Sequence, residues 1–179
     1  KAMKKAGVKP IIGCEVYVPH DRRDRDYDRD GSYTHLILLV KNETGYKNLC
    51  YLVSCGFLEG FYIKPRIDWP LLKEHAEGLV CLSGCLAGAI PRMLVQGDYA
   101  GAKALAENLR SAFAPGDFYL EIQNHGIPEE LTAAQGLRRL SRETGIPLVL
   151  TNDAHYLEKS DARTQDVLLC IQTGKTVDD

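Results

Sequence analysis

The 179-residue sequence has no apolar run long enough to span a membrane and no amino-terminal pattern typical of a signal peptide. It also lacks a strong charge of one sign, because 22 Lys and Arg residues stand against 24 Asp and Glu residues. Any contact with nucleic acid would therefore have to be local or mediated by metal ions. We expect a cytoplasmic protein with no membrane partner.

Several motifs of common enzyme classes are missing as well. There is no Gly-rich phosphate loop, and no Ser or Cys stands in a nucleophile-elbow pattern. The cysteines do not form the two closely spaced pairs of a zinc knuckle, and we expect reduced, intracellular thiols. They are Cys14, Cys50, Cys55, Cys81, Cys85 and Cys170.

The composition, 45% hydrophobic and 26% charged, is that of one soluble globular domain. Apolar periodicity predicts strands at 10–18, 34–40, 79–83, 117–123 and 147–150. It predicts helices at 44–57, 68–75, 99–113, 129–144 and 160–170, and one more that ends near 95. This alternation predicts an α/β fold with a mostly parallel sheet and helical crossovers.

Two further segments carry expectations of their own. DRRDRDYDRD at 21–30 mixes both charges, so we expect a solvated loop that makes a poor phosphate clamp. KAMKKAGVKP at 1–10 looks like the last turns of a basic helix, and the TVDD ending is equally abrupt. We therefore expect a fragment of a longer chain, residues 1–179, whose upstream part is missing.

The stretch LVLTNDAHY at 148–156 is the most informative one. Its apolar run predicts a buried strand, and the strand leads directly into Asp153 and His155. Side chains two residues apart in an extended chain point the same way, so this carboxylate and this imidazole can converge on one divalent ion. The alternative is a polar loop in which Asp153 caps the next helix and His155 is solvated.

Other predicted strands also contain or end in residues of the metal-ligand type. Because sites assemble at the carboxyl ends of parallel strands, such residues together favour a multinuclear metal site. The residues concerned are Glu15, Cys85, and Glu121 with His125, and His35 fits less well because it lies at a strand entry. Taken singly, His35 could be a satisfied core histidine, Cys85 a small hydrophobe, and Glu121 with His125 a turn network. His20 and His75 are expected at the surface.

These residues lie in stretches that resemble the PHP (polymerase and histidinol phosphatase) domains of bacterial replicative DNA polymerase III alpha subunits. The resemblance covers nearly the whole chain outside the Asp/Arg loop, and EGFYIKPRID favours the replicative type over the error-prone paralogue. The matching stretches are KKAGVKPIIGCEVYV at 4–18, HLILLVKNETGYKNL at 35–49, EGFYIKPRID at 59–68, LSGCLAG at 82–88, FYLEIQNHG at 118–126, TNDAHYL at 151–157 and DVLLCIQTGKT at 166–176. One departure is Ala89, where the family usually has an acidic residue.

The resemblance implies a distorted (βα)7 barrel, of which the chain would supply about five of the seven strands, with the family's first His-rich motifs upstream of Lys1. It further implies up to three divalent ions, zinc first, with magnesium or manganese as the other candidates. Carried over by motif, the metal ligands would be Glu15, His35, Cys85, Asp153 and His155. The catalytic residues would be Asp153 and His155, and His125 is added as a group that binds phosphate or steers a proton.

The function implied is metal-dependent 3′–5′ exonuclease proofreading within a DNA-directed DNA polymerase, with the primer 3′ end and other polymerase subunits as partners. Two other readings stay open. The domain could be catalytically silent, docking a separate proofreading exonuclease or bracing the polymerase. It could also be a stand-alone phosphoesterase acting on a small phosphate ester.

Overall fold

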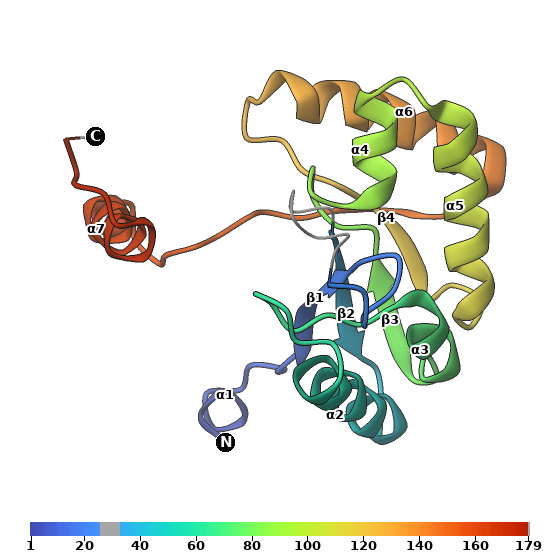
Figure 1. The fold of residues 1–179 in the computed structure, drawn as a ribbon, viewed down its shortest axis with the longest axis horizontal. Helices are drawn as coiled ribbons and strands as arrows, with labels where there is room; N and C mark the ends of the chain where they lie inside the picture. Colours follow the sequence, from blue (N-terminus) through green and yellow to red (C-terminus); the bar gives the residue numbers. More distant parts are fainter. Residues whose placement is uncertain (26–32, 179) are drawn as a thin grey trace.

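A computed structural model describes residues 1–25 and 33–178. Its body contains one five-stranded sheet with the order β1-β2-β3-β4-β5, flanked by helices (Figure 1). The strands are β1 (Gly13–Val18), β2 (Thr34–Val40), β3 (Leu79–Leu82), β4 (Phe118–Ile122) and β5 (Leu148–Leu150). The helices are α1 (Ala2–Lys5), α2 (Glu43–Leu58), α3 (Trp69–Glu74), α4 (Ala89–Val95), α5 (Tyr99–Ala112), α6 (Pro128–Thr144) and α7 (Ala162–Thr173), with a 3₁₀ turn η2 (Lys159–Asp161) before α7.

The sheet is mixed, so the prediction of a mostly parallel sheet was wrong. β2 runs antiparallel to both β1 and β3, whereas β3, β4 and β5 are parallel to one another. The first residue of β2, Thr34, lies opposite the last residue of β1, Val18, which fixes the antiparallel direction of this pair. The described sheet is open, with β1 and β5 at its edges, and does not close into a barrel. Leu148 and Leu150 of the edge strand β5 are 39% and 76% exposed, so the prediction of a buried strand there was wrong.

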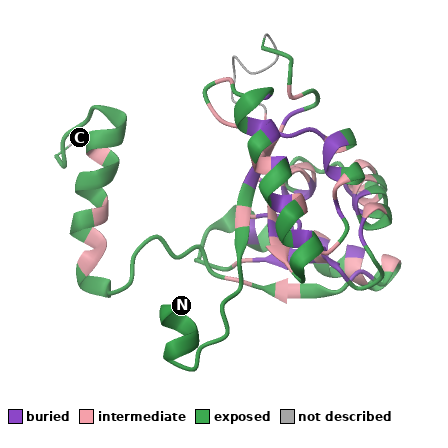
Figure 2. Ribbon diagram, turned by 90° about the horizontal axis from the view of Figure 1, so that it is seen from below, coloured by how far each residue is buried: buried purple, intermediate pink, exposed green. Residues whose placement is uncertain are grey.

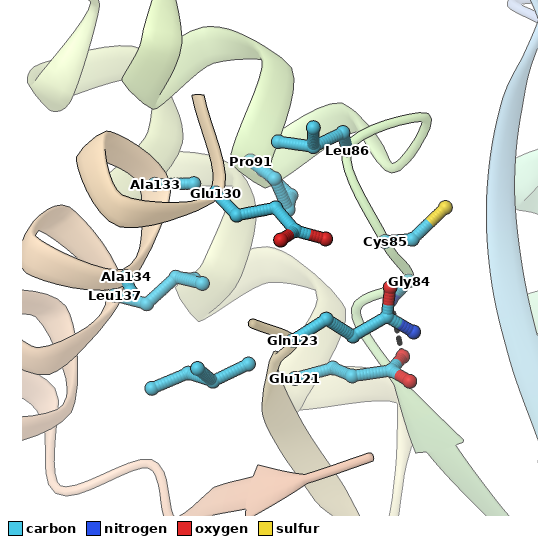
Figure 3. A pocket seen from close by; sticks show the side chains of 11 residues that line it. Gly84, Cys85, Leu86, Pro91, Glu121, Gln123, Glu130, Ala133, Ala134 and Leu137 are labelled. Carbon is cyan, nitrogen blue, oxygen red and sulfur yellow. Dashed lines mark hydrogen bonds between the residues drawn. The ribbon is translucent and has the colours of Figure 1, made fainter. Parts of the chain in front are cut away.

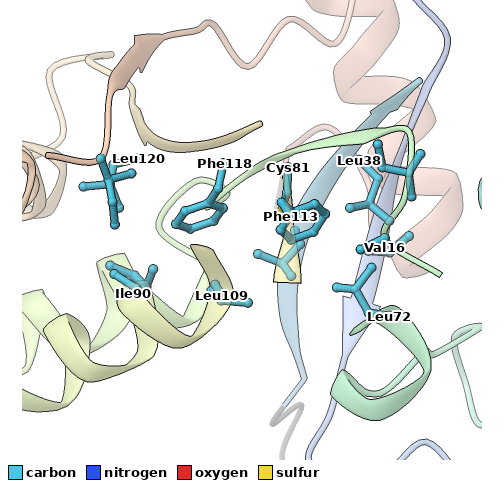
Figure 4. Packing of buried hydrophobic residues seen from close by; sticks show 14 of the residues in the cluster. Val16, Leu38, Leu72, Cys81, Ile90, Leu109, Phe113, Phe118 and Leu120 are labelled. Atoms are coloured by element: carbon cyan, nitrogen blue, oxygen red, sulfur yellow. The ribbon is translucent and has the colours of Figure 1, made fainter. Parts of the chain in front are cut away.

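One face of the sheet is apolar and packs against the helices. Val16, Leu38, Cys81, Phe118 and Leu120 point to this face and are at most 5% exposed. Helix α2 contacts β1, β2 and β3, and α6 contacts β4 and β5. Figure 4 shows how side chains from the strands meet those from the helices in this core. Because side chains alternate along a strand, the residues between these positions point to the opposite face.

A buried arginine fastens the start of the 21–30 loop to the body. Arg66 is only 1% exposed, and its guanidinium donates hydrogen bonds to the carbonyl oxygens of Gly60, Asp24 and Arg22. Arg22 in turn pairs with Asp68 at 2.8 Å and Glu59 at 2.7 Å. The prediction of a solvated loop was therefore wrong for Arg22, and residues 26–30 lie outside the described part.

The two ends of the described chain stand apart from the body. Neither α1 nor α7 contains a buried residue, and Figure 2 shows both helices almost entirely in the colours of exposed and intermediate residues. The exposed apolar side chains of α7 are Val167, Leu168, Leu169 and Ile171. In the part of the chain that the structure describes, no helix is long and apolar enough to cross a membrane.

Two glycines of α2, Gly45 and Gly56, allow the packing of this helix to be tested with a matched pair of variants. A Cβ on Gly45 would lie 1.8 Å from the Gly78 carbonyl oxygen, whereas one on Gly56 would make ordinary contacts at 3.5 Å. We expect Gly45→Ala to lower the free energy of unfolding by about 2 kcal/mol through overpacking. Gly56→Ala should raise it by up to about 1 kcal/mol, since alanine favours a helix. Chemical denaturation measures both, and equal effects would contradict the packing of α2 against Gly78.

Candidate functional site

The antiparallel direction of β2 brings two predicted ligands together. Its first residues lie at the sheet edge where β1 ends, because His35 pairs with Tyr17 in the register. His35 and Glu15 therefore share the face opposite the core, and His35 Nδ1 lies 3.4 Å from Glu15 Oε1. His35 fitted the sequence pattern less well only because β2 was expected to run parallel to its neighbours.

The environment of His35 is aromatic and leaves one nitrogen without a hydrogen bond. Its ring lies 5.1 Å from the ring of Tyr17 and 6.0 Å from that of Tyr33, measured between centroids. Its Nδ1 is buried and makes no hydrogen bond within the described residues. His35 Nδ1 therefore lacks the hydrogen bond that a satisfied core histidine would have, and the Glu15 carboxylate lies 3.4 Å from it.

The loop after β3 holds Cys85 beside these residues. Gly84 adopts a φ of +83°, and a Cβ there would lie 2.7 Å from the His35 carbonyl oxygen, so the loop depends on glycine at this point. The His35 amide donates to the carbonyl of Ala87 at 3.1 Å. The segment that carries Cys85 is therefore fixed directly against the start of β2.

The thiol of Cys85 lies among carboxylates. Partial burial raises its pKa above the ordinary value, and the negative charges of Asp153, Glu15 and Glu121 raise it further, while a backbone hydrogen bond from Ala87 acts in the opposite direction. Burial and this negative charge together favour the protonated thiol of Cys85 in the metal-free protein.

Glu121 of β4 is the best-connected acidic side chain of this region. It is 5% exposed, and its carboxylate accepts hydrogen bonds from the Gly84 amide and the Thr151 hydroxyl. Its own amide donates to the hydroxyl of Ser83. Figure 3 shows the link to Gly84 as a dashed line, in the pocket next to Cys85 and Gln123. The sequence placed Glu121 at the correct edge but gave no sign of these bonds.

His125 lies in a turn network, but its partner is Glu130 and not Glu121, with which the network was expected. Its Nδ1 lies 2.8 Å from Glu130 Oε1, and its amide donates to the other oxygen of the same buried carboxylate. The hydrogen bond from His125 lowers the pKa of Glu130 against the effect of burial, which raises it. The Asp153 amide donates a hydrogen bond to His125 Nε2 at 3.3 Å, so Nε2 is the acceptor and Nδ1 donates to Glu130. Nothing in the sequence pointed to Glu130.

Asp153 and His155 lie in the extended segment after β5 and face solvent. Their side chains are 57% and 59% exposed, and His155 Nδ1 lies 3.8 Å from Asp153 Oδ1 and 2.9 Å from the Asp153 carbonyl oxygen. Asp153 does not cap a helix, because Glu158 and Asp161 form the capping box that precedes α7. His125 and the segment 152–156 together line a shallow pocket.

His20 is exposed as expected, whereas His75 is half-buried against Tyr51, with ring centroids 4.4 Å apart.

The donor set suits a zinc-type ion, because it offers carboxylate oxygens, imidazole nitrogens and one thiol. The buried, unbonded Nδ1 of His35 beside Glu15 is the feature that best fits a coordinated cation. Among residues 1–25 and 33–178, however, no three His, Cys, Asp or Glu side chains converge closely enough to hold a metal ion. The described residues thus supply possible metal donors but do not form a complete coordination shell.

The charges around Cys85 lead to a test in the metal-free protein. A raised pKa keeps the thiol protonated at neutral pH, so Cys85 should be alkylated more slowly than the exposed Cys50. Asp153→Asn removes a negative charge, lowers the pKa of Cys85 and should speed its alkylation about threefold. Peptide mass spectrometry with iodoacetamide measures both rates. An unchanged alkylation rate of Cys85 in Asp153→Asn would mean that the charge of Asp153 does not act on this thiol.

Comparison with known proteins identifies the family of the chain. Residues 1–125 match the family model described as "PHP domain". The chain is 49% identical to "DNA polymerase III subunit alpha" of Treponema pallidum over 100% of its own length, and 50% identical to the protein of that name from Thermus aquaticus over 97%. It spans only 16% and 14% of those two relatives, respectively. The chain therefore belongs to the PHP domain family, and its similarity to DNA polymerase III alpha subunits extends over its whole length.

Proposed function

We propose that the chain is the PHP domain of the catalytic alpha subunit of a bacterial replicative DNA polymerase III, a DNA-directed DNA polymerase of the cytoplasm. Within it, this domain would hydrolyse the phosphodiester bond of a mispaired primer 3′ nucleotide, as a 3′–5′ exonuclease. The observation that carries the proposal is the buried Nδ1 of His35, which makes no hydrogen bond within the described residues and lies 3.4 Å from the Glu15 carboxylate. Relatives named as alpha subunits supply the link to DNA.

The five described strands would be part of the distorted seven-stranded barrel of this family. Two features support this proposal. Among the described residues, the outer edge of β5 carries no further strand, and that of β1 carries only a single bridge, between Tyr17 and Arg66. Glu15 and His35 also occupy the face that a closed barrel would enclose. Open edges of this kind are normally paired or covered in a folded protein.

Five side chains would hold the metal ions. Glu15 and Asp153 would supply carboxylate oxygens, His35 and His155 ring nitrogens, and Cys85 a thiolate after it loses its proton. Zinc is the first candidate, because thiolate and imidazole ligands favour it over magnesium or manganese. Ions held in this way lower the pKa of a bound water and neutralise charge on a phosphodiester.

The remaining groups of the site act on protons and on orientation. Glu130 fixes the tautomer of His125 so that Nε2, on the side of Asp153, carries the lone pair. Nε2 of His125 could accept a proton from a water near Asp153 once the Asp153 amide has moved from it. Asp153 and His155 are open to solvent, so a nucleotide end can reach them.

A second candidate function is a catalytically silent module that docks a separate proofreading exonuclease subunit or braces the polymerase. It is favoured by the lack of any three converging ligand side chains in the described ranges. A stand-alone phosphoesterase is less well supported, because the relatives at 49% and 50% identity are named as subunits of a DNA polymerase.

The central test is Asp153→Asn in the full-length protein that carries this chain. We expect the variant to bind less zinc by elemental analysis and to degrade a 3′-mismatched primer at least about tenfold more slowly, since a metal-binding oxygen is lost. Asp166→Asn, on the exposed surface of α7, is the matched control and should change neither quantity. Wild-type protein without bound metal and without degradation would favour the silent module.

A further inference from the structure

We propose that Glu121 is the positioning residue of this site: it couples the loop that carries Cys85 to the segment that carries Asp153 and His155. The inference rests on the proposed function, because only a metal site gives the two coupled segments a common role. The coupling itself rests on hydrogen bonds of the described chain.

Glu121 lies between two segments that are far apart in the sequence. Its Oε2 accepts a hydrogen bond from the Gly84 amide at 3.0 Å, and its Oε1 accepts one from the Thr151 hydroxyl. Gly84 precedes Cys85, and Thr151 stands two residues before Asp153. The Glu121 carboxylate thus hydrogen-bonds to the segment after β3, which carries Cys85, and to the segment after β5, which carries Asp153 and His155.

The burial of this carboxylate indicates that the bonds are strong. Glu121 is 5% exposed, and no Lys or Arg ion pair to it occurs within the described residues. A buried carboxylate without a counter-charge is costly unless hydrogen bonds satisfy its oxygens. The amide of Gly84 and the hydroxyl of Thr151 meet that need, and hydrogen bonds to a charged acceptor are stronger than neutral ones.

The coupling extends beyond the two bonds of the carboxylate. Gly84 packs against the carbonyl of His35, whose side chain reaches Glu15. On the other side, Gln123 of the same strand end donates to the Thr151 hydroxyl at 3.2 Å. Every predicted ligand is therefore connected to Glu121 through a short series of contacts, although Glu121 itself matches no ligand position of the family motif.

Both oxygens of Glu121 accept hydrogen bonds from the chain, one from each of the two segments, as a positioning role requires. Its role is then to fix the separation of two ligand-bearing segments, and its loss should release both of them. Ligands held loosely bind an ion more weakly, even when all of them are present.

Hydrogen exchange of the metal-free, full-length protein tests the coupling directly. We expect Glu121→Ala to speed amide exchange in segments 83–88 and 151–156 by about tenfold or more, the factor for losing a charged hydrogen bond. Glu121→Gln should restore most of the protection, because its amide oxygen can accept from Gly84 while its amide nitrogen donates to Thr151. Unchanged exchange in either segment of Glu121→Ala would overturn the proposal.

Asp117 provides a matched control at the opposite end of the same strand. It is a carboxylate 7% exposed, but it pairs with Lys41 at 2.8 Å and touches neither segment. Asp117→Asn should leave exchange in 83–88 and 151–156 unchanged, and equal loosening there would mean general destabilisation. If Glu121→Ala does not fold, Thr151→Val and Thr151→Ser test the same hydrogen bond, because only serine keeps the hydroxyl. Amide exchange in 151–156 should become faster in the valine variant alone. Equal exchange rates in both variants would overturn the proposal.

A cobalt titration separates this inference from the proposed function. Co²⁺ added to the wild-type protein should produce a thiolate charge-transfer band from Cys85, and Glu121→Ala should need at least about tenfold more Co²⁺ to reach it. Glu121→Gln should restore the affinity. No band in the wild type would count against the metal site itself, whereas a band of equal affinity in Glu121→Ala would count against the positioning role alone.

Discussion

The alternation of side chains across the sheet is the constraint on which the rest of the molecule depends. Val16, Leu38 and Phe118 must face the helices, because nothing else in the described chain removes that apolar surface from water. The residues between them are then forced to the other face. Glu15 and Glu121 are placed there by the burial of their neighbours, so the polar face is a direct result of the apolar one.

The local elements were largely predictable because their signals are local. The strand 34–40 and the helix that ends with Gly145 as its cap appear as expected, and Asp68 caps α3 through a bond to the Leu71 amide. The direction of β2 was not predictable from alternation alone, since it depends on a connection without helical periodicity. That one difference also explains why His35 seemed misplaced at a strand entry.

The candidate residues stood out in the sequence, but the hydrogen bonds around them did not. Asp153 and His155 stand out because a carboxylate and an imidazole directly follow an apolar strand. Glu121 carries no such signal, since an acidic residue within a strand is usually solvated, and only its neighbours Gly84 and Thr151 reveal its burial. Glu130 was equally hidden, because its partner His125 lies in a turn and its own position is on a helix.

Arg66 has a consequence for the order in which parts of the molecule lose structure. Its guanidinium donates hydrogen bonds to the carbonyls of Asp24 and Arg22. If residues 21–25 opened, the buried Arg66 cation would lose both of these hydrogen bonds, which is costly. These residues therefore belong to the same cooperative unit as the core, despite their charge-rich sequence. On heating they should melt together with α3 and β1 instead of fraying beforehand, as surface loops of such composition normally do.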